Sequence, residues 1–280
     1  MGLGIRNIIK NFPSYIKGGG GIVKVELNYS QSPLLDGKNV VITGGSSGIG
    51  FATAKKCLMS GANVVITGRS RKKLDDAVEK LREFGNVYSV QQDVTDIESM
   101  NFKIQEILSC LNGRVDCLVN NAGIAINHNY YDVSLADYDQ IFNTCLKGPY
   151  FLTREIYKKM VADNVKGSIV MVSSNGAIIG HTIPYGIAKA GINNYCEGLA
   201  KEGINHGIRC NAVMPTYTTT SIMDEFKEVD VNGNMYKPYI KGNRWHRPEE
   251  IAELIAFLLS DNSNCVTGQL IACDSGNTVR

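Results

Sequence analysis

The chain has 280 residues, of which 44% are hydrophobic, so it is long enough to bury the core of one large α/β domain. Its 29 Lys and Arg residues against 27 Asp and Glu residues give a formal net charge of +2, which argues against nucleic acid as a partner. Because no stretch approaches the ~20 apolar residues of a membrane span and the N-terminus lacks the apolar core of a secretory signal, we expect a soluble cytoplasmic protein.

Residues 1–37 are expected to form an N-terminal arm outside the main domain. Ile5, Ile8 and Ile9 share one helical stripe, and the run GGGG at 18–21 predicts a flexible joint. Packing of this stripe on the body of the protein or on a neighbouring subunit is favoured over a weak membrane-surface anchor.

From residue 38 onward, short β-branched runs alternate with longer amphipathic segments. The runs predict buried parallel strands at 39–45, 63–68, 87–92, 117–123, 168–174, 208–215 and 269–276. Helical spacing with few breakers predicts helices at 50–59, 72–84, 100–110, 136–160, 185–202 and 248–259. The alternation predicts a single α/β domain over 38–280, a Rossmann-like, doubly wound, seven-stranded parallel sheet with helices on both faces. Ligands of such sheets bind outside the carboxyl ends of the strands.

The loop after the first strand has the composition of a phosphate-binding turn. In VVITGGSSGIGFATAKKCL, three glycines permit a tight turn and close approach of the backbone to a pyrophosphate, and the following helix offers free N–H groups. The G-x-x-x-G-x-G spacing is a weak signal alone, so a purely structural turn is the alternative, but the strand before it and the helix after it strengthen the interpretation. The residues expected around a dinucleotide here are Gly44, Ser46, Ser47, Gly48, Ile49 and Gly50.

The end of the second strand indicates which dinucleotide binds. Enzymes that prefer NAD carry an acidic residue there for the ribose hydroxyls. Gly68 occupies this place instead, and Arg69, with Arg71 close by, can meet a 2′-phosphate through charge-assisted hydrogen bonds. NADP(H) is therefore favoured over NAD(H), whereas Lys72 and Lys73 are interpreted as the solvated start of the next helix.

The cysteine and histidine residues form no recognisable disulfide or metal framework. None of the eight cysteines belongs to a C-x-x-C pair and several lie inside apolar runs, so we expect reduced thiols in the core. The four histidines have no partner at i+4 and no neighbouring carboxylate cluster, so we predict no metal site.

Tyr185 and Lys189 stand four positions apart, so on a helix their side chains lie on one face. Ser174 precedes them, at the end of the fifth predicted strand. Taken alone, a tyrosine and a lysine one turn apart are interpreted as incidental, but the phosphate loop favours a chemical role.

Four motifs in this order resemble the short-chain dehydrogenase/reductase family: the glycine loop, NNAG at 120–123, the Ser174, Tyr185 and Lys189 constellation, and TGQLIACDSG near the C-terminus. The resemblance covers residues 38–280 and implies an NAD(P)-dependent oxidoreductase acting on a carbonyl or a secondary alcohol. It also implies that Asp93 contacts the adenine and Thr220 the carboxamide. The further cofactor-binding positions that it implies are Val94, Asn120, Ala122, Gly123, Tyr185, Lys189 and Pro215.

The resemblance assigns the chemistry to three side chains. Tyr185 would exchange a proton with the substrate oxygen, Lys189 would lower the tyrosine's pKa from about 10 and hold the nicotinamide ribose, and Ser174 would orient the substrate. The family's usual serine-to-tyrosine spacing is two residues longer than in this chain, so Ser173 is the alternative to Ser174. His181, in the same loop, is a candidate to line the substrate cleft, with a solvated histidine as the other interpretation.

Two residues depart from the family's usual pattern. Cys145 stands where the family often has an asparagine that helps to hold a water for proton relay, and Thr216 replaces the usual glycine after Pro215. These departures motivate a rival hypothesis, a turnover-deficient NADP(H)-binding sensor or assembly subunit of the same fold.

The substrate itself is not named by the sequence. A loop at 216–247 is expected to cover a small-molecule substrate of the 3-oxoacyl thioester, ketone or keto-sugar type. By analogy with the family, a homodimer or homotetramer is expected to form through the helices at 136–160 and 185–202.

Overall fold

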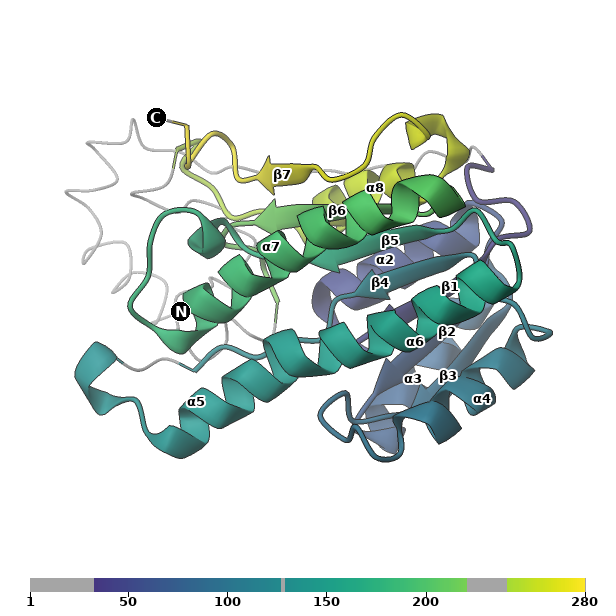
Figure 1. Cartoon of the computed structure of the whole chain (residues 1–280), viewed down its shortest axis with the longest axis horizontal. Coiled ribbons are helices and arrows are strands. Elements are labelled where there is room, and N and C mark those ends of the chain that lie inside the picture. The colour runs from purple at the N-terminus through teal and green to yellow at the C-terminus, as the bar shows by residue number, and fades with distance from the viewer. Residues whose placement is uncertain (1–32, 127–128, 221–240, 280) are drawn as a thin grey trace, which may run out of the picture.

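The computed structural model describes residues 33–126, 129–220 and 241–279, and within them the predicted parallel sheet is confirmed. Seven strands pair in parallel in the order β3-β2-β1-β4-β5-β6-β7 (Figure 1). The order reverses between β1 and β4, which is where a doubly wound sheet opens a crevice at its carboxyl edge. The strands are β1 (Asn39–Thr43), β2 (Asn63–Gly68), β3 (Val87–Gln91), β4 (Cys117–Asn120), β5 (Ser168–Val172), β6 (Arg209–Pro215) and β7 (Leu270–Cys273).

Two apolar layers hold the helices against the two faces of the sheet. The helices are α2 (Gly48–Met59), α3 (Arg71–Leu81), α4 (Met100–Cys110), α5 (Leu135–Phe142), α6 (Gly148–Ala162), α7 (Pro184–Gly203) and α8 (Pro248–Leu259). Helices α2, α3 and α8 share one buried cluster with the sheet, and α4, α6 and α7 share the other (Figure 1). Successive strand residues point to opposite faces, so Val40 and Ile42 pack in the first layer and Val41 in the second. Coverage on both faces explains why the strand runs are continuously apolar.

The start of α7 determines where the candidate reactive side chains lie. Proline suits the first turn of a helix, because its φ is preset and its missing N–H has no partner there, and Pro184 begins α7. Tyr185 consequently falls in the first turn and Lys189 one turn later.

The helix expected at 136–160 is not regular, and that prediction is wrong in its middle. A π-helical segment, Asn143–Lys147, separates α5 from α6. Such wide turns are frequent at functional sites, and this one contains Cys145. Glycine is required immediately after it, because a Cβ added at Gly148 would lie 2.4 Å from the Val94 carbonyl oxygen.

The domain core also begins earlier than the predicted boundary at residue 38. Leu35 is fully buried, and its N–H donates to the Ser60 carbonyl at 2.9 Å. Leu34 packs on the same core cluster. The rest of the predicted arm, including the isoleucine stripe and the GGGG run, lies outside the described residues.

The two ends of the loop expected at 216–247 are bonded to each other, and the loop residues 221–240 lie outside those described. The His246 N–H donates to the Tyr217 carbonyl at 2.9 Å, and the Trp245 ring, almost fully buried, meets the Tyr217 ring edge-on. The two loop ends are thus one packed unit beside the carboxyl end of β6.

His246 makes this unit sensitive to acid. Burial and the nearby Arg244 charge lower the pKa of the His246 imidazole. In the unfolded chain a histidine titrates near pH 6.5, so below that pH the unfolded state binds the extra proton more readily. We expect the free energy of unfolding to be retained above about pH 6.5 and to fall as the pH drops below it. Urea titrations at neutral and mildly acidic pH measure this free energy. Its loss on acidification should be smaller in His246→Gln than in the unmodified protein, and equal losses in the two proteins would contradict this.

The structure bears on two further sequence expectations, the reduced state of the cysteines and the lack of a membrane-spanning helix. All eight cysteine thiols are free, and five are buried as expected, but Cys265 is exposed. Within the described ranges, none of the helices combines the length and the apolar character that a membrane span requires.

Candidate active site

A cavity of about 340 Å³ lies at the carboxyl edge of the sheet, where β1, β4, β5 and β6 end. Its walls include Ile49 after the glycine loop, Asn121 after β4, Ser174 after β5 and Tyr185 of α7. Segments far apart in the sequence therefore meet in one place, as the doubly wound topology predicts.

The glycine loop has the geometry of a pyrophosphate cradle. Gly44 and Gly48 have φ angles of +65° and +54°, a region that glycine adopts without strain. At Gly50, an added Cβ would lie 2.3 Å from the Gly44 carbonyl oxygen, so the first turn of α2 packs directly on the loop backbone. Ser47 precedes this turn without capping it through its side chain, and the turn holds no acidic residue. These N–H groups and the positive end of the helix dipole suit a phosphate group.

Asn121 holds this loop in place, a role that the sequence motif NNAG did not assign to it. Its side-chain amide donates to the carbonyls of Thr43 at 3.0 Å and Gly44 at 3.1 Å. The neighbouring Asn120, which was expected to face the cofactor, instead donates its amide to Thr153 Oγ1 of α6 at 2.7 Å. Successive residues at a strand end point to opposite faces, so only one asparagine of NNAG can face the cleft. The NNAG motif therefore indicates that an asparagine faces the cleft, but it does not indicate which of the two does so.

The end of β2 is open where an acidic side chain would stand in an NAD-preferring site. A Cβ at Gly68 would lie 3.8 Å from Ser46 Oγ, so this position borders the glycine loop. Arg69 is exposed, and within the described residues its guanidinium has no hydrogen-bond or ion-pair partner. The Arg71 guanidinium, in contrast, contacts Ser89 Oγ at 3.2 Å and the Asp75 carboxylate at 3.4 Å.

The remaining expected cofactor positions are distributed around the same edge. The Asp93 carboxylate accepts hydrogen bonds from Thr95 N–H and Oγ1, at 2.9 and 2.8 Å, so local turn structure already uses it. Val94 is buried. Thr220 lies across from the loop, with its Cγ2 3.0 Å from where a Gly48 Cβ would be. Gly123, Pro215 and Thr220 line the cavity, and the Ala122 N–H donates to Thr43 Oγ1 at 3.0 Å.

Ser174, Tyr185 and Lys189 all face the cavity. The Ser174 hydroxyl lies near the Tyr185 phenol and favours the ionised form of that phenol. The Lys189 ammonium donates to the Val172 carbonyl at 2.7 Å and lies 5.7 Å from the centre of the Tyr185 ring. The hydroxyl of Ser173, the alternative serine, donates to the Lys189 carbonyl at 3.2 Å, so geometry places Ser174 beside the phenol.

The direction of the Tyr185 pKa shift differs from the sequence expectation. Burial, and to a smaller extent the adjacent Cys145, raises the pKa of the Tyr185 phenol above its ordinary value, and the nearby Ser174 hydroxyl only partly offsets this. Burial also lowers the pKa of Lys189. The prediction that Lys189 holds the tyrosine's pKa below 10 is therefore wrong for this structure, because removing the phenol from water outweighs any help from the ammonium.

Cys145 borders the same group from the π-helical segment. Its side chain is 1% exposed, and Sγ contacts the Ile124 carbonyl at 3.4 Å. A Cβ added at Gly123 would lie 3.6 Å from Lys189 Nζ and 3.8 Å from Cys145 Sγ, so thiol and ammonium approach the same point. The residue at the family's usual asparagine position therefore does contact the site.

Known proteins of this architecture match nearly the whole domain. The family model described as enoyl-(acyl carrier protein) reductase matches residues 44–278. A short-chain type dehydrogenase/reductase from Mycobacterium marinum superposes with a TM-score of 0.82 at 27% identity, over 89% of this chain and 98% of its own. The chain belongs to the short-chain dehydrogenase/reductase family. Recognition from the sequence motifs is thereby confirmed, and the protein is an oxidoreductase of the NAD(P)-dependent, alcohol–carbonyl class.

Two curated members of the short-chain dehydrogenase/reductase family illustrate its range. The 3-oxoacyl-(acyl-carrier-protein) reductase FabG of Thermotoga maritima is 35% identical over 245 residues, which cover 86% of this chain and 98% of that protein. An L-rhamnose 1-dehydrogenase (NAD(P)(+)) of Sphingomonas sp. is 32% identical over 251 residues, which cover 87% and 97% respectively.

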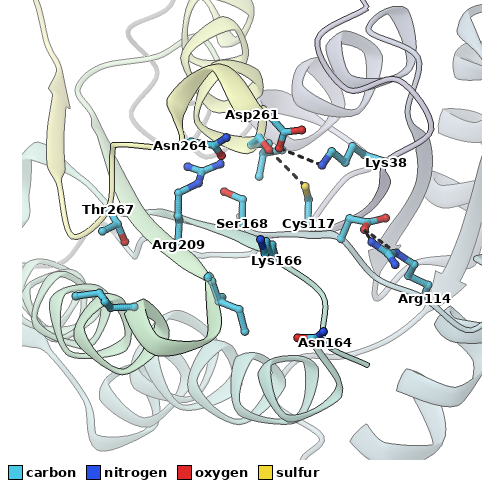
Figure 2. Close-up of a pocket in the computed structure, with 15 residues that line it drawn as sticks. Lys38, Arg114, Cys117, Asn164, Lys166, Ser168, Arg209, Asp261, Asn264 and Thr267 are labelled. Atoms are coloured by element: carbon cyan, nitrogen blue, oxygen red, sulfur yellow. Dashed lines mark hydrogen bonds and ion pairs between the residues drawn. The ribbon is translucent and has the colours of Figure 1, made fainter. Parts of the chain in front are cut away.

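This short-chain dehydrogenase/reductase has a second, larger cavity of about 730 Å³ at the opposite, amino edge of the sheet (Figure 2). Cys117, Ser168 and Arg209 are neighbours in register across β4, β5 and β6. Their side chains donate to the carbonyls at the end of α8: Cys117 to Leu259 at 3.7 Å, Ser168 to Leu258 at 2.8 Å, and Arg209 to Leu258 at 2.8 Å and Ser260 at 2.9 Å. These three side chains thus cap the C-terminus of α8, where the last carbonyls of a helix have no partner within the helix. The three side chains at this cavity therefore hold the end of α8.

Removing the Arg209 cap should therefore destabilise the fold without touching catalysis. Arg209→Met keeps the side-chain bulk but deletes the charged hydrogen bonds, and we expect the free energy of unfolding to fall by about 2 to 3 kcal/mol. Lys166→Met is the matched control, because Lys166 is an exposed cation of the same cavity. Urea denaturation measures both, and equal stabilities of the two variants would contradict the capping role.

Proposed function

We propose that this protein is an NADP(H)-dependent reductase of ketone-type carbonyls, such as 3-oxoacyl thioesters, ketones or keto sugars, and that it also catalyses the reverse oxidation of secondary alcohols. One observation supports this more than any other: a single cavity joins the glycine loop to Ser174, Tyr185 and Lys189. The names of the FabG and rhamnose dehydrogenase relatives support a carbonyl or hydroxyl carbon as the reacting centre.

In this proposal, each side chain acts on the substrate oxygen. A tyrosine has an ordinary pKa near 10 and burial raises that of Tyr185 further, so the phenol is protonated at neutral pH and can donate its proton to the carbonyl oxygen. Lys189, fixed by the Val172 carbonyl, stabilises the phenolate that remains. Ser174 accepts the Gly176 N–H at 3.1 Å, which orients its hydroxyl toward the same oxygen. When bound, the nicotinamide supplies the hydride to the carbonyl carbon.

We further propose that Arg69 selects NADP(H) by binding the 2′-phosphate. The support is its exposed, unpartnered guanidinium among the described residues, next to the open position at Gly68. Arg69→Gln is expected to raise the Kd of NADPH by about 10- to 100-fold and to leave NADH binding unchanged. Arg71→Gln is the matched control, since Arg71 already has two partners. An equal loss of affinity for NADPH and for NADH would show that Arg69 does not bind the 2′-phosphate.

The proposal extends to assembly and location. Helices α5 and α6 expose aromatic side chains, among them Tyr138 and Tyr150, which supports a homodimer or homotetramer formed through these helices and α7. The eight free thiols support a reducing compartment, the cytoplasm.

The activity is tested by NADPH oxidation against ketones, 3-oxoacyl thioesters, quinones and keto sugars. Turnover of at least one carbonyl compound supports the reductase. Tight NADPH binding without turnover of any compound would favour the rival function, a cofactor-binding sensor or assembly subunit.

A further inference from the structure

The imidazole of His181 shares the catalytic cavity with Ser174 and Tyr185. A Cβ added at Gly176 would lie 3.2 Å from His181 Nε2 and 3.3 Å from Ser174 Oγ. The ring nitrogen and the substrate-orienting hydroxyl therefore converge on the same small volume. A ligand whose oxygen binds Ser174 would have its neighbouring atoms next to this nitrogen.

A second glycine fixes the ring in this place. Gly186 directly follows Tyr185 in α7, and an added Cβ there would lie 2.4 Å from His181 Cβ and 2.8 Å from its Cγ. Any other residue at 186 would displace the histidine, so the imidazole is seated on the helix backbone beside the candidate proton donor. Its position relative to Tyr185 is set by packing rather than by a hydrogen bond.

The imidazole is available to a ligand. Within the described residues, neither ring nitrogen of His181 has a hydrogen-bond or ion-pair partner, unlike His246, whose Nε2 meets Ser275 Oγ at 2.7 Å. The ammonium of Lys189, which also lines the cavity, is engaged by the Val172 carbonyl. No Asp or Glu is among the described residues that line the cavity. The site therefore favours a negative group and lacks one of its own.

We propose that His181 binds a carboxylate of the substrate, which makes the substrate an oxo acid or the corresponding hydroxy acid. Because His181 Nε2 and Ser174 Oγ both approach the space beside Gly176, the carboxylate is placed about one or two carbons from the reacting carbonyl. A charge-assisted hydrogen bond from the imidazole then positions the carbonyl under Tyr185. This inference rests on the proposed function, and it excludes 3-oxoacyl thioesters as the preferred substrates, because a thioester carries no charge at this place.

Binding to a protein without turnover tests this directly. In the Tyr185→Phe background with NADPH bound, calorimetric titration compares 3-oxobutanoate with its methyl ester at slightly acidic pH. We expect the acid to bind about tenfold more tightly, and His181→Asn to abolish that difference. His181→Arg should preserve it, because a guanidinium also donates hydrogen bonds to a carboxylate. His206→Asn is the control, since His206 lies at the opposite edge of the sheet, packed against Tyr157.

The outcomes separate this inference from the proposed function. Equal affinities for acid and ester, no acid binding at millimolar concentration, or a preference that survives His181→Asn would each overturn the role of His181. If the unmodified enzyme reduces neutral ketones or thioesters with no preference for acids, the carboxylate-binding role of His181 is overturned and the proposed reductase activity is upheld. Acid binding that depends on His181, in a protein that turns over no carbonyl, would uphold the carboxylate site and overturn the reductase.

Discussion

Replacing Tyr185 by phenylalanine is expected to lower kcat by about 10²- to 10⁴-fold, the usual contribution of a positioned proton donor. The phenol faces the cavity beside Ser174, and burial raises its pKa above the ordinary value near 10, so it is protonated at neutral pH. The variant deletes one oxygen and leaves the ring in place. Ser174 keeps its hydrogen bond from the Gly176 N–H, so we expect neither the fold nor the Kd of NADPH to change. Steady-state NADPH oxidation and fluorescence titration measure the two quantities.

Tyr195→Phe is the matched control for this experiment. Tyr195 lies on the same helix, but its hydroxyl contacts the Tyr150 carbonyl at 3.4 Å, and its ring packs on Tyr150, away from the cavity. Its turnover should equal that of the unmodified protein. If Tyr185→Phe retained full turnover, another group would have to supply the proton and the proposed mechanism would be wrong. If neither protein turned over any carbonyl while both bound NADPH tightly, the sensor hypothesis would gain support.

The sequence predicts correctly those elements whose local residue pattern is compatible with only one backbone conformation. Buried parallel strands read as continuous apolar runs, and all seven were found near their expected positions. Gly44 and Gly48 were identifiable because only glycine adopts their φ angles without strain. The spacing of Tyr185 and Lys189 sufficed because a helix places residues four apart on one face.

The features that were missed depend on contacts between distant segments. Asn120 and Asn121 are chemically identical, and only the approach of Gly44 on one side and Thr153 on the other assigns their roles. The π-helical segment that contains Cys145 is followed by Gly148, whose backbone packs on the Val94 carbonyl, a contact that periodicity does not reveal. The sign of the Tyr185 pKa shift was predicted from the neighbouring charge alone. Burial decides it, and the depth of burial belongs to the folded structure.

Gly50→Ala is expected to have the largest effect on cofactor binding. The added Cβ would lie 2.3 Å from the Gly44 carbonyl oxygen and 2.5 Å from Asn121 Nδ2, so the loop must move and the Asn121 hydrogen bond to Gly44 must stretch. Overpacking of this kind lowers the free energy of unfolding by about 1 to 3 kcal/mol. Because the displaced backbone N–H groups are those that would meet the pyrophosphate, the Kd of NADPH should rise by about tenfold or more.

Gly198→Ala separates this effect from the general cost of replacing a glycine. Gly198 is an exposed glycine of α7, and an added Cβ there has no atom within 4 Å. Alanine is the better helix former, so this variant should gain about 0.5 to 1 kcal/mol in the free energy of unfolding and bind NADPH unchanged. Denaturant titration and NADPH titration of both variants give the comparison. Undiminished NADPH affinity in Gly50→Ala would mean that the pyrophosphate does not sit on this loop, because no cradle of this shape tolerates a methyl group pressed against its own carbonyl.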